Sequence, residues 1–384
     1  MSKLVIITHK EIYSGKNENS FATTGGFPFQ IEMISKLFSS TSLLCTLRDN
    51  PNIDNLTEIK GKNLSVVALK EPPFNNYKRH LSLLIWLPKN IKTILKHIES
   101  ADIVHSMIPG DIGLIGLLIA LFLKKKIFVR HCGTWGNKTT LADRFIFWLL
   151  PIVASKKVIV FATGGGQSVP EPNNQYIHWI FSTSIHKKEW ENITPAEPWT
   201  PELSLKLISV SRITKDKNIK SIIFAFSLLK KHFSDISLEI IGDGEEKKKL
   251  EEIVIELNLK GKITFTGNLD HNSVINKMSE SHIFLFPTRT KEGFPKVLIE
   301  AMACGLPIIS SRVSVIPEMI ENKCGIILDA TDANSICGGI IDMIDNPKKL
   351  GKMGKEARRI SQGFFLEKWQ DSIKVTLGKH WIDQ

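Results

Sequence analysis

Short apolar runs alternate with amphipathic helical patterns along the first half of the chain. The runs "KLVIITH", "SLLCTL", "LSVVAL", "ADIVHS", "KIFVRH" and "KVIVFA" predict buried strands. Between them lie the helical patterns "FPFQIEMISKLF", "NIKTILKHI" and "IGLIGLLIALFL". Alternation of this kind is typical of a parallel sheet covered by helices. The first half therefore predicts an α/β domain.

A proline-rich stretch, "HKKEWENITPAEPWTPELS", interrupts this pattern, and the alternation then restarts at "LKLISVS". We interpret the stretch as a linker between two doubly wound α/β domains, residues 1–198 and 199–365. Ligands are expected where the carboxyl ends of the strands face a cleft. The last segment, residues 366–384, is helical, and its Trp369 and Trp381 predict that it packs back towards the N-terminal domain.

Composition limits the class of protein. With 384 residues, 42% of them hydrophobic and 23% charged, the chain has an ordinary globular composition. The longest apolar run, Ile112 to Leu123, is shorter than the roughly 18 residues of a membrane-spanning helix. The first residues lead into a strand pattern without a secretory signal. The cysteines, five in number, are scattered without a CxxC pair, so we expect neither disulfides nor a zinc site, and a cytoplasmic location.

The positive charge is concentrated in the N-terminal half. Of the net charge of +11, residues 1–200 carry +8 (23 Lys and Arg against 15 Asp and Glu) and the remainder +3. Such a surplus favours an anionic partner, which could be a membrane leaflet, a phosphorylated substrate or nucleic acid. Nucleic acid is the weakest of the three, since no known binding module or basic aromatic platform accompanies the charge.

The stretch "YKRHLSLLIWLPKNIKTILKHI" combines apolar and basic positions at helical spacing. Its apolar side is formed by Ile91, Ile94, Leu95 and Ile98, and its basic side by Lys89, Lys92 and Lys96. Two interpretations stay open. The helix could lie on an anionic membrane surface and dock a lipid-linked acceptor, or it could pack on the sheet with a solvated basic face.

The stretch "KEGFPKVLIEAMACGLPIISS" holds two glutamates around a helix start. Pro295 suits the first turn of a helix, so we expect a helix from Pro295 to a break at Gly305, with Glu292 in the preceding loop. The free N–H groups of a helix N-terminus form an anion site. Glu300, one to two turns in, could reach a ribose; alternatively it pairs with Lys296 at i,i+4 spacing, and Glu292 is a solvated loop charge.

Together with "VIPEMI", this stretch resembles the signature of family 4 of the retaining, nucleotide-sugar-dependent glycosyltransferases (glycosyl transferases group 1). The resemblance extends to "LISVSRITKDKNIKSIIFAF", "LEIIGDGEEKKKLEEI" and "ITFTGNLDHNSVINKMSESHIFLFPT", and so covers roughly residues 203–345 in order. It implies the GT-B fold, with two Rossmann-like domains facing a cleft: an acceptor-binding N-terminal domain and a nucleotide-sugar-binding C-terminal domain.

The resemblance also assigns donor-binding roles. It implies that Arg212 and Lys217 contact the donor diphosphate, and fixed cations there would stabilise the charge that builds as the sugar leaves. Glu292 would hold hydroxyls of the donor sugar, Glu300 would hold the ribose, and Gly242 would allow close approach of the base. The backbone N–H groups of the segment from Phe294 to Val297 would cradle the phosphate. Within this segment Pro295 has no N–H, so the donors are Phe294, Lys296 and Val297. Without the resemblance, Arg212 and Lys217 are solvated cations and Gly242 is a turn glycine.

The N-terminal half is matched more loosely. "TTGGFPFQIEM" resembles the glycine loop of the family, in which Gly25 and Gly26 would bring backbone close to the donor phosphate and the acceptor. His131, in "VRHCGTW", corresponds to a histidine that in relatives contacts the donor sugar near the reacting carbon; a structural role is the alternative. His105 is expected to pack in the core. Where relatives carry an asparagine-glycine turn, this chain has "FSTSIH", so the cleft edge there is expected to differ.

The expected reaction is transfer of a hexose or N-acetylhexosamine from a UDP- or GDP-linked donor to a glycan or lipid-linked acceptor, in bacterial surface polysaccharide or lipopolysaccharide synthesis. Retention of configuration follows from the resemblance alone. No Asp-x-Asp triplet is present, so neither a metal nor another cofactor is expected. A sugar-nucleotide 2-epimerase of the same fold would release free epimer without an acceptor, and a non-catalytic partner subunit would have lost the charged residues. The glutamate loop and the retained cations favour the transferase.

Overall fold

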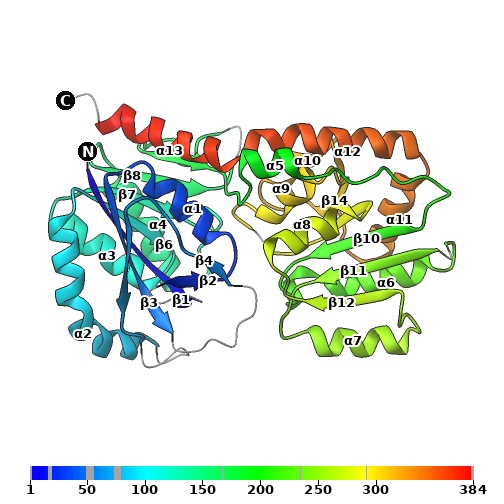
Figure 1. Ribbon diagram of the computed structural model, residues 1–384, viewed down its shortest axis with the longest axis horizontal. Helices are drawn as coiled ribbons and strands as arrows, with labels where there is room; N and C mark the ends of the chain where they lie inside the picture. Colours follow the sequence, from blue (N-terminus) through cyan, green and yellow to red (C-terminus); the bar gives the residue numbers. More distant parts are fainter. Residues whose placement is uncertain are drawn as a thin grey trace. The chain divides into compact units, whose positions relative to one another are not determined.

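The computed structural model describes residues 2–15, 20–48, 56–72, 79–165, 168–233, 235–290 and 292–381. The chain forms two compact units (Figure 1). The N-terminal unit comprises Met1–Phe181 and Leu366–Gln384, and the C-terminal unit comprises Ser182–Phe365.

The N-terminal unit is built on a mainly parallel sheet. Its parallel strands lie in the order β5-β3-β1-β6-β7-β8-β9, and β2 pairs antiparallel with both β1 and β4. The bounds of the strands are β1 Lys3–Ser14, β2 Phe21–Thr23, β3 Ser40–Arg48, β4 Thr57–Glu58, β5 Leu64–Leu69, β6 Ile103–Ile108, β7 Lys126–His131, β8 Val158–Thr163 and β9 Ile177–Ile180. The strand order reverses between β1 and β6, which is where a doubly wound sheet opens a crevice.

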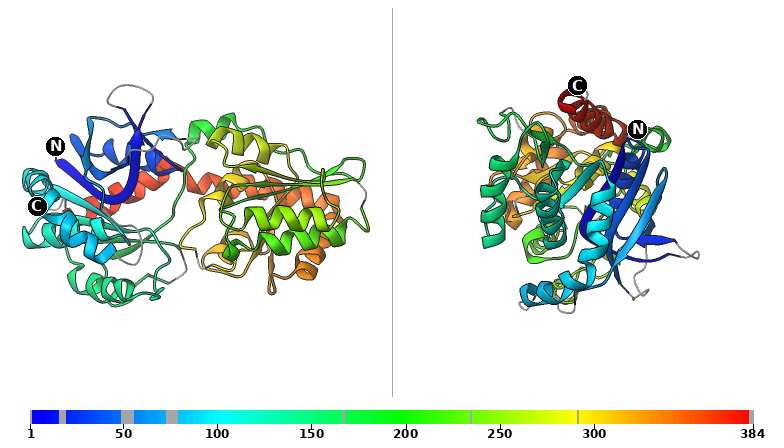
Figure 2. Two further views of the ribbon diagram at one scale, coloured as in Figure 1. Left: turned by 90° about the horizontal axis from the view of Figure 1, so that it is seen from below. Right: turned by 90° about the vertical axis from the view of Figure 1, so that its left-hand side faces the viewer.

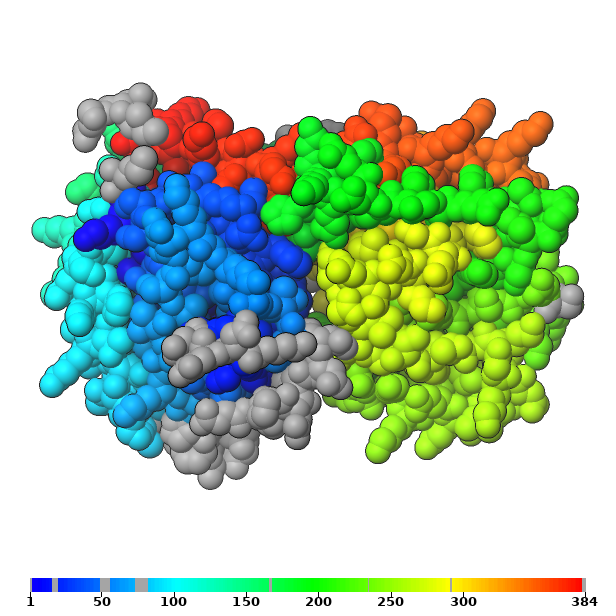
Figure 3. Space-filling view, in the orientation of Figure 1, coloured from blue at the N-terminus to red at the C-terminus, as the bar shows by residue number. Residues whose placement is uncertain are grey.

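Helices cover both faces of this sheet. One face carries α2 (Arg79–Ser100), α3 (Asp111–Phe122) and α4 (Leu141–Val153), whose inward residues share one apolar core. The other face carries α1 (Phe27–Ser35) and the last helix, α13 (Leu366–Trp381). In Figure 3 the red atoms of α13 lie against the blue atoms of the first part of the chain.

The last helix is anchored by its aromatic residues. Trp369 is buried, and the guanidinium carbon of Arg130 lies 5.1 Å from the centre of its ring. Gln370 donates a hydrogen bond to the carbonyl of Met33 in α1, and Trp381 donates one to the carbonyl of Lys156. The chain thus returns from the C-terminal unit to complete the core of the N-terminal one.

The C-terminal unit has a parallel sheet in the order β12-β11-β10-β13-β14-β15, with helices on both faces (Figures 1 and 2). Its strands are β10 Leu205–Val210, β11 Ile236–Ile241, β12 Ile263–Gly267, β13 Ile283–Phe286, β14 Ile308–Ser311 and β15 Gly325–Leu328. Its helices are α5 Lys187–Asn192, α6 Ile219–Leu229, α7 Lys247–Glu256, α8 His271–Ser279, α9 Lys296–Ala303, α10 Ile316–Ile320, α11 Ala333–Ile344 and α12 Pro347–Ser361, with 3-10 turns at Lys215–Lys217 and Gln362–Phe364.

The boundary between the units differs from the predicted one. It lies at Phe181/Ser182, before α5, and not after Pro198. Arg358 of α12 contacts the proline-rich stretch, because it donates hydrogen bonds to the carbonyls of Trp190 and Ile193 as well as to that of Ala303. Its guanidinium carbon also lies 4.1 Å from the centre of the Trp190 ring. The proline-rich stretch is therefore packed structure of the C-terminal unit and not a free linker.

The basic helix pattern near the N-terminus forms α2, and its apolar side faces inward. Ile94 and Ile98 are fully buried in the core under the sheet, whereas Lys89, Lys92 and Lys96 are exposed. The buried apolar residues of this helix therefore pack on the sheet, and an association of its exposed basic side with an anionic membrane stays a prediction. Among the described helices, none has the length and hydropathy needed to cross a bilayer.

Candidate functional site

The strand order of the C-terminal unit reverses between β10 and β13. In doubly wound sheets, ligands bind outside the carboxyl ends of the strands at such a reversal. The loop after β10 carries Arg212 and leads into the 3-10 turn that ends at Lys217. The loop after β13 carries Glu292 and leads into α9. The charged residues that the sequence singles out in this half therefore meet at one edge of one sheet.

Lys217 and Glu292 form an ion pair between the Nζ and Oε1 atoms. The side chain of Lys217 is 7% exposed and its Nζ lies 5.7 Å from the centre of the Phe286 ring. Burial lowers the pKa of Lys217, as does the positive charge of Arg212, while the charge of Asp216 opposes them. Arg212 itself is exposed. The segment that follows β10 thus carries one exposed cation, Arg212, and one buried cation, Lys217. The description of Lys217 as a solvated cation is therefore wrong.

Asp216 joins the two loops. Its carboxylate accepts hydrogen bonds from the hydroxyls of Thr214 and Thr290, and its carbonyl accepts one from the N–H of Arg289 at 2.8 Å. Burial acts to raise the pKa of Asp216, but these hydroxyl hydrogen bonds outweigh it and lower that pKa. Our sequence reasoning missed Asp216, although it lies next to Lys217 in the run "TKDKN".

The helix after the glutamate loop forms as predicted, to within one residue. Pro295 is the N-cap, α9 spans Lys296–Ala303, and the chain turns at Gly305 with φ of +75°. Phe294 and Pro295 are buried, and Lys296 and Val297 are partly buried. The N-terminus of α9 follows Glu292 directly, and the partial positive charge of such an end attracts anions.

Glu300 lies in a polar cluster within the C-terminal unit. Its Oε1 accepts a hydrogen bond of 2.5 Å from the hydroxyl of Ser184 and lies 3.7 Å from Nδ1 of His271. The other ring nitrogen of His271 lies 2.6 Å from Oε1 of Glu189. The identified partners of Glu300 are thus Ser184 and His271, neither of which the sequence analysis singled out. Ser184 comes from the "FSTSIH" stretch, so an expected departure from the family pattern supplies a contact to the glutamate.

Three carboxylates surround His271 and determine its charge. Burial acts to lower its pKa, but the hydrogen bond to Glu189 and the charges of Glu300, Glu189 and Asp270 outweigh burial, and the pKa is raised above its ordinary value. His271 lies between Glu189 and Glu300 and contacts both carboxylates. The first residue of α8 thereby positions a side chain of α9.

Gly242 is required by the backbone. Its φ is +134°, a conformation that favours glycine, and a Cβ at this position would lie 1.9 Å from the carbonyl oxygen of Ser211. The end of β11 therefore packs tightly on the loop that carries Arg212. The predicted approach of a nucleotide base to Gly242 stays a prediction.

The remaining candidate residues lie in the N-terminal unit. Gly25, with φ of +75°, and Gly26, the N-cap of α1, follow the hairpin strand β2. His131 ends β7 and is 2% exposed, with its Nδ1 3.2 Å from the carbonyl oxygen of Gly133. Burial lowers the pKa of His131 to about 4, so the imidazole is neutral near pH 7. Its contact with the donor sugar stays a prediction.

His105 has the role that the sequence predicts. It is fully buried, and its ring stacks on that of Phe128 with the ring centres 4.1 Å apart. It belongs to the core.

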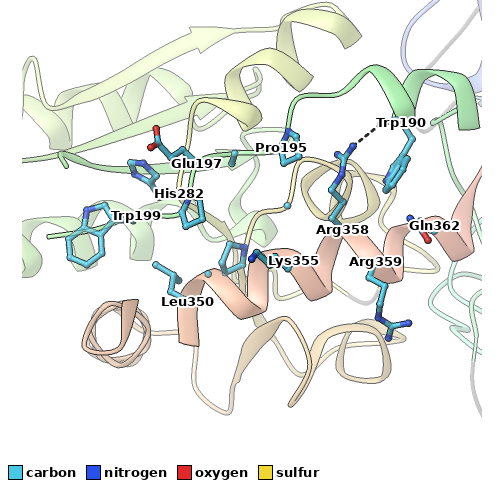
Figure 4. Close-up of a pocket in the computed structure, with 16 residues that line it drawn as sticks. Trp190, Pro195, Glu197, Trp199, His282, Leu350, Lys355, Arg358, Arg359 and Gln362 are labelled. Carbon is cyan, nitrogen blue, oxygen red and sulfur yellow. Dashed lines mark hydrogen bonds between the residues drawn. The ribbon is translucent and has the colours of Figure 1, made fainter. Parts of the chain in front are cut away.

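A pocket of about 420 Å³ in the C-terminal unit lies away from these residues (Figure 4). Trp199 and Pro195 line it on one side and Lys355 of α12 on the other. His282 and Pro307, which precede β13 and β14, also line it, so it adjoins the amino ends of the strands. The loops that carry Arg212, Lys217 and Glu292 follow the carboxyl ends of the strands, so the pocket is a separate place. In the described part of the chain, no group of three or more His, Cys, Asp or Glu side chains could hold a metal ion.

The sequence model of the family described as "Glycosyl transferases group 1" matches residues 195–360, which include Arg212, Lys217, Glu292 and Glu300. The C-terminal unit is thus similar in sequence to the group 1 glycosyl transferases. The match covers most of that unit and none of the N-terminal unit.

Two of the curated relatives likewise match less than half of this chain. A GDP-mannose-dependent phosphatidylinositol monomannoside mannosyltransferase of Mycolicibacterium smegmatis is 26% identical over 171 residues, 43% of this chain and 44% of that protein. An N-acetyl-α-D-glucosaminyl L-malate synthase of Bacillus anthracis is 31% identical over 40% of this chain and 39% of that protein. The chain thus spans less than half the length of these relatives. An uncharacterized glycosyltransferase of Methanocaldococcus jannaschii is 25% identical over 82% of this chain and 85% of that protein.

Solved structures resemble the whole chain. A sucrose-phosphate synthase of Thermosynechococcus elongatus has a TM-score of 0.74 at 15% identity and covers 100% of both chains. An Anabaena protein in complex with UDP-glucose has a TM-score of 0.70 at 15% identity, covering 99% of this chain and 100% of that one. A glycosyltransferase involved in lipopolysaccharide biosynthesis has a TM-score of 0.67 at 13% identity and covers 99% of both chains. The chain therefore has the GT-B fold that the sequence predicts.

Proposed function

We propose that this protein is a retaining glycosyltransferase that moves a hexose or N-acetylhexosamine from a UDP- or GDP-linked donor to a glycan or lipid-linked acceptor. The observation that carries the proposal is the convergence of Lys217, Arg212, Glu292 and the N-terminus of α9 at the strand reversal of the C-terminal unit. Cations and a helix N-terminus together suit a diphosphate.

Arg212, Lys217 and the N–H groups at the start of α9 bind the diphosphate of the donor. As the bond between sugar and phosphate breaks, negative charge grows on the leaving diphosphate, and fixed charges stabilise it most because they need no reorganisation. The low exposure of Lys217 strengthens this effect, since its charge is poorly screened by water. The residues present thus supply the electrostatic stabilisation without a further group.

The carboxylates orient the donor. When the diphosphate engages Lys217, Glu292 is released from its ion pair and accepts hydrogen bonds from hydroxyls of the donor sugar. Glu300 accepts hydrogen bonds from the ribose, with its carboxylate held by Ser184 and His271. Glu292 thus binds the sugar and Glu300 binds the ribose of one nucleotide sugar.

The N-terminal unit supplies the acceptor side. Gly25 and Gly26 leave backbone unobstructed next to the acceptor, and neutral His131 hydrogen-bonds the donor sugar near the reacting carbon. Retention of configuration rests on the resemblance to family 4. We further propose that the enzyme acts in the cytoplasm, at the inner face of the membrane, in the synthesis of a surface polysaccharide or lipopolysaccharide. The relatives named for a phosphatidylinositol acceptor and for lipopolysaccharide biosynthesis support this setting.

A donor panel tests the proposal. The purified protein is incubated with UDP-glucose, UDP-galactose, UDP-N-acetylglucosamine and GDP-mannose, with and without extracted lipid-linked glycans, and nucleoside diphosphate release is followed. We expect one donor to be consumed with transfer to an acceptor, and Glu292→Gln to abolish it, while Lys248→Gln, an exposed change on α7, leaves it intact. Nuclear magnetic resonance of the new linkage gives its configuration. Release of a free epimer without acceptor would overturn the proposal in favour of an epimerase.

A further inference from the structure

The outward face of α4 is a line of large apolar side chains. Leu141, Phe145, Trp148 and Ile152 are exposed by 81%, 40%, 60% and 63%, and their spacing of four, three and four residues places them along one side of the helix. The opposite side, with Ile146 and Leu150, is buried in the core. Large apolar side chains gathered on an exposed surface mark an interaction site, so this side of α4 calls for a partner.

The neighbouring helix α3 extends this surface. Its Leu118 and Phe122 are exposed by 42% and 85%. Since α3 and α4 follow the adjacent strands β6 and β7 and share one core, they cover the same face of the sheet. Figure 2 shows α4, drawn in blue-green, at the periphery of its unit in both views. We call Leu118, Phe122, Leu141, Phe145, Trp148 and Ile152 the apolar face.

Positive charge surrounds the apolar face. Residues 118–157 contain eight Lys and Arg but a single acidic residue, Asp143. Lys124 follows Phe122 by two positions, and Lys156 and Lys157 follow Ile152 by four and five. The carboxyl ends of both helices thus lead directly into lysines.

Some of these lysines line a pocket of about 930 Å³ at the amino ends of the strands. Its cations are Lys36, Lys124, Lys125, Lys126, Lys157 and Lys374, and Asp102 is the acidic residue among its lining. The carboxylate of Asp102 already accepts the N–H of Lys3 at 2.7 Å, and the Nζ of Lys125 donates to two backbone carbonyls. Phe38, Leu377 and Trp381 give the pocket apolar walls. A cationic pocket with apolar walls suits a group that joins a phosphate to a hydrocarbon.

We propose that the apolar face and this pocket together dock the N-terminal unit on an anionic lipid bilayer. The aromatic and aliphatic side chains enter the interfacial layer, and the lysines engage the phosphates of the headgroups. Self-association through the same surface is disfavoured, because two copies would bring like charges together. This proposal rests on the membrane-linked acceptor of the proposed function and adds to it the surface that docks on the membrane. That surface differs from the buried side of α2.

Vesicle flotation tests the proposal with the full chain. Vesicles of phosphatidylcholine with one quarter phosphatidylglycerol are expected to carry the protein upward at 50 mM NaCl, and pure phosphatidylcholine vesicles to carry at least tenfold less. Trp148→Ser with Ile152→Ser, and separately Lys124→Gln with Lys157→Gln, are expected to lower the bound fraction about tenfold. Matched controls in the C-terminal unit, Ile255→Ser (61% exposed) and Lys248→Gln with Lys249→Gln, are expected to leave it unchanged.

Two further readings separate this proposal from its alternatives. Brominated lipids are expected to quench tryptophan fluorescence, and Trp148→Phe to remove part of that quenching while flotation persists. Nucleotide binding in buffer, measured on the same variants, is expected to match that of the wild type, so a failure of the donor-site proposal and a failure of docking are distinguishable. Absence of flotation on anionic vesicles, flotation indifferent to the apolar face, or a dimer in light scattering that Trp148→Ser dissolves would overturn the proposal.

Discussion

Lys217 and Glu292 are joined by an ion pair although 75 positions separate them in the sequence. One residue follows β10 and the other follows β13, so the pair spans the strand reversal at which a doubly wound sheet binds its ligand. A cation and a carboxylate that pair in the absence of ligand can both be redirected to a ligand that carries phosphates and hydroxyls. In the function that we propose, the pair keeps both groups in place until the donor binds.

The first prediction concerns Lys217. Lys217→Ala removes the buried cation next to the leaving group, and kcat/KM for the donor should fall about 10²- to 10³-fold, the loss seen when one preorganised electrostatic group is removed. Lys217→Arg should recover part of this loss because it keeps the charge. Steady-state kinetics measure both variants. Equal activity of Lys217→Ala and the wild type would contradict the assignment.

The second prediction concerns the hydrogen bond from Ser184 to the carboxylate of Glu300. Ser184→Ala removes the hydrogen bond to the carboxylate, and Glu300→Gln removes the charge that accepts ribose hydroxyls. We expect nucleotide affinity to fall about fivefold in the first variant and about tenfold or more in the second, since one hydrogen bond is worth roughly 1 kcal/mol and one to a charged group more. Calorimetric titration measures both. A larger loss in Ser184→Ala than in Glu300→Gln would mean that Ser184 acts on the ligand directly.

The third prediction is a pH dependence of stability from His271. Its pKa is raised in the folded protein, so its contribution is fully present below the unfolded pKa near 6.5 and is lost as pH rises through the folded value. The free energy of unfolding from urea melts should therefore decline more steeply above pH 6.5 in the wild type than in His271→Gln.

His131 and His282 provide the contrast for this measurement. Burial lowers the pKa of each to about 4, so their contributions are lost as pH falls below 6.5 and do not overlap with the window of His271. If the wild type and His271→Gln have the same slope above pH 6.5, the described carboxylate cluster does not hold a protonated imidazole.

The fourth prediction concerns Arg358, which fastens α5 and the proline-rich segment to α12 and α9. Arg358→Ala leaves the carbonyls of Ala303, Trp190 and Ile193 without their donor and removes the cation over the Trp190 ring. We expect the free energy of unfolding to fall by about 2–4 kcal/mol, as when a buried hydrogen-bond network is broken. Arg359→Ala, a change at an exposed neighbour on the same helix, should cost under about 0.5 kcal/mol.

Residues whose environment is local were predictable from the sequence. The helix after Glu292 and its end near Gly305 follow from proline and glycine, whose backbone preferences act within a few residues. The alternation of strands and helices predicts two doubly wound α/β domains for the same reason, whereas the GT-B class follows from the resemblance to family 4. The burial of His105 was also predictable, since it lies within an apolar strand.

Relationships between distant segments were not predictable. Nothing near Ser184 indicates that it meets Glu300 across 116 positions, and Asp216 looks like a charge beside a lysine until the loop after β13 folds onto it. The proline-rich stretch reads as a linker because proline breaks periodic patterns, whereas Arg358, far along the chain, packs it into the C-terminal unit. Such pairings depend on tertiary folding, which a local pattern does not encode.

Calorimetric titration with UDP, GDP and ADP tests the central claim most directly, because it needs neither the sugar nor the acceptor. We predict saturable binding of UDP or GDP to the wild type, weakened about tenfold or more by Arg212→Ala and by Glu300→Gln and unchanged by Lys248→Ala. Binding of UDP or GDP that survives both site variants, or no binding of any of the three, would contradict a donor site at the strand reversal between β10 and β13.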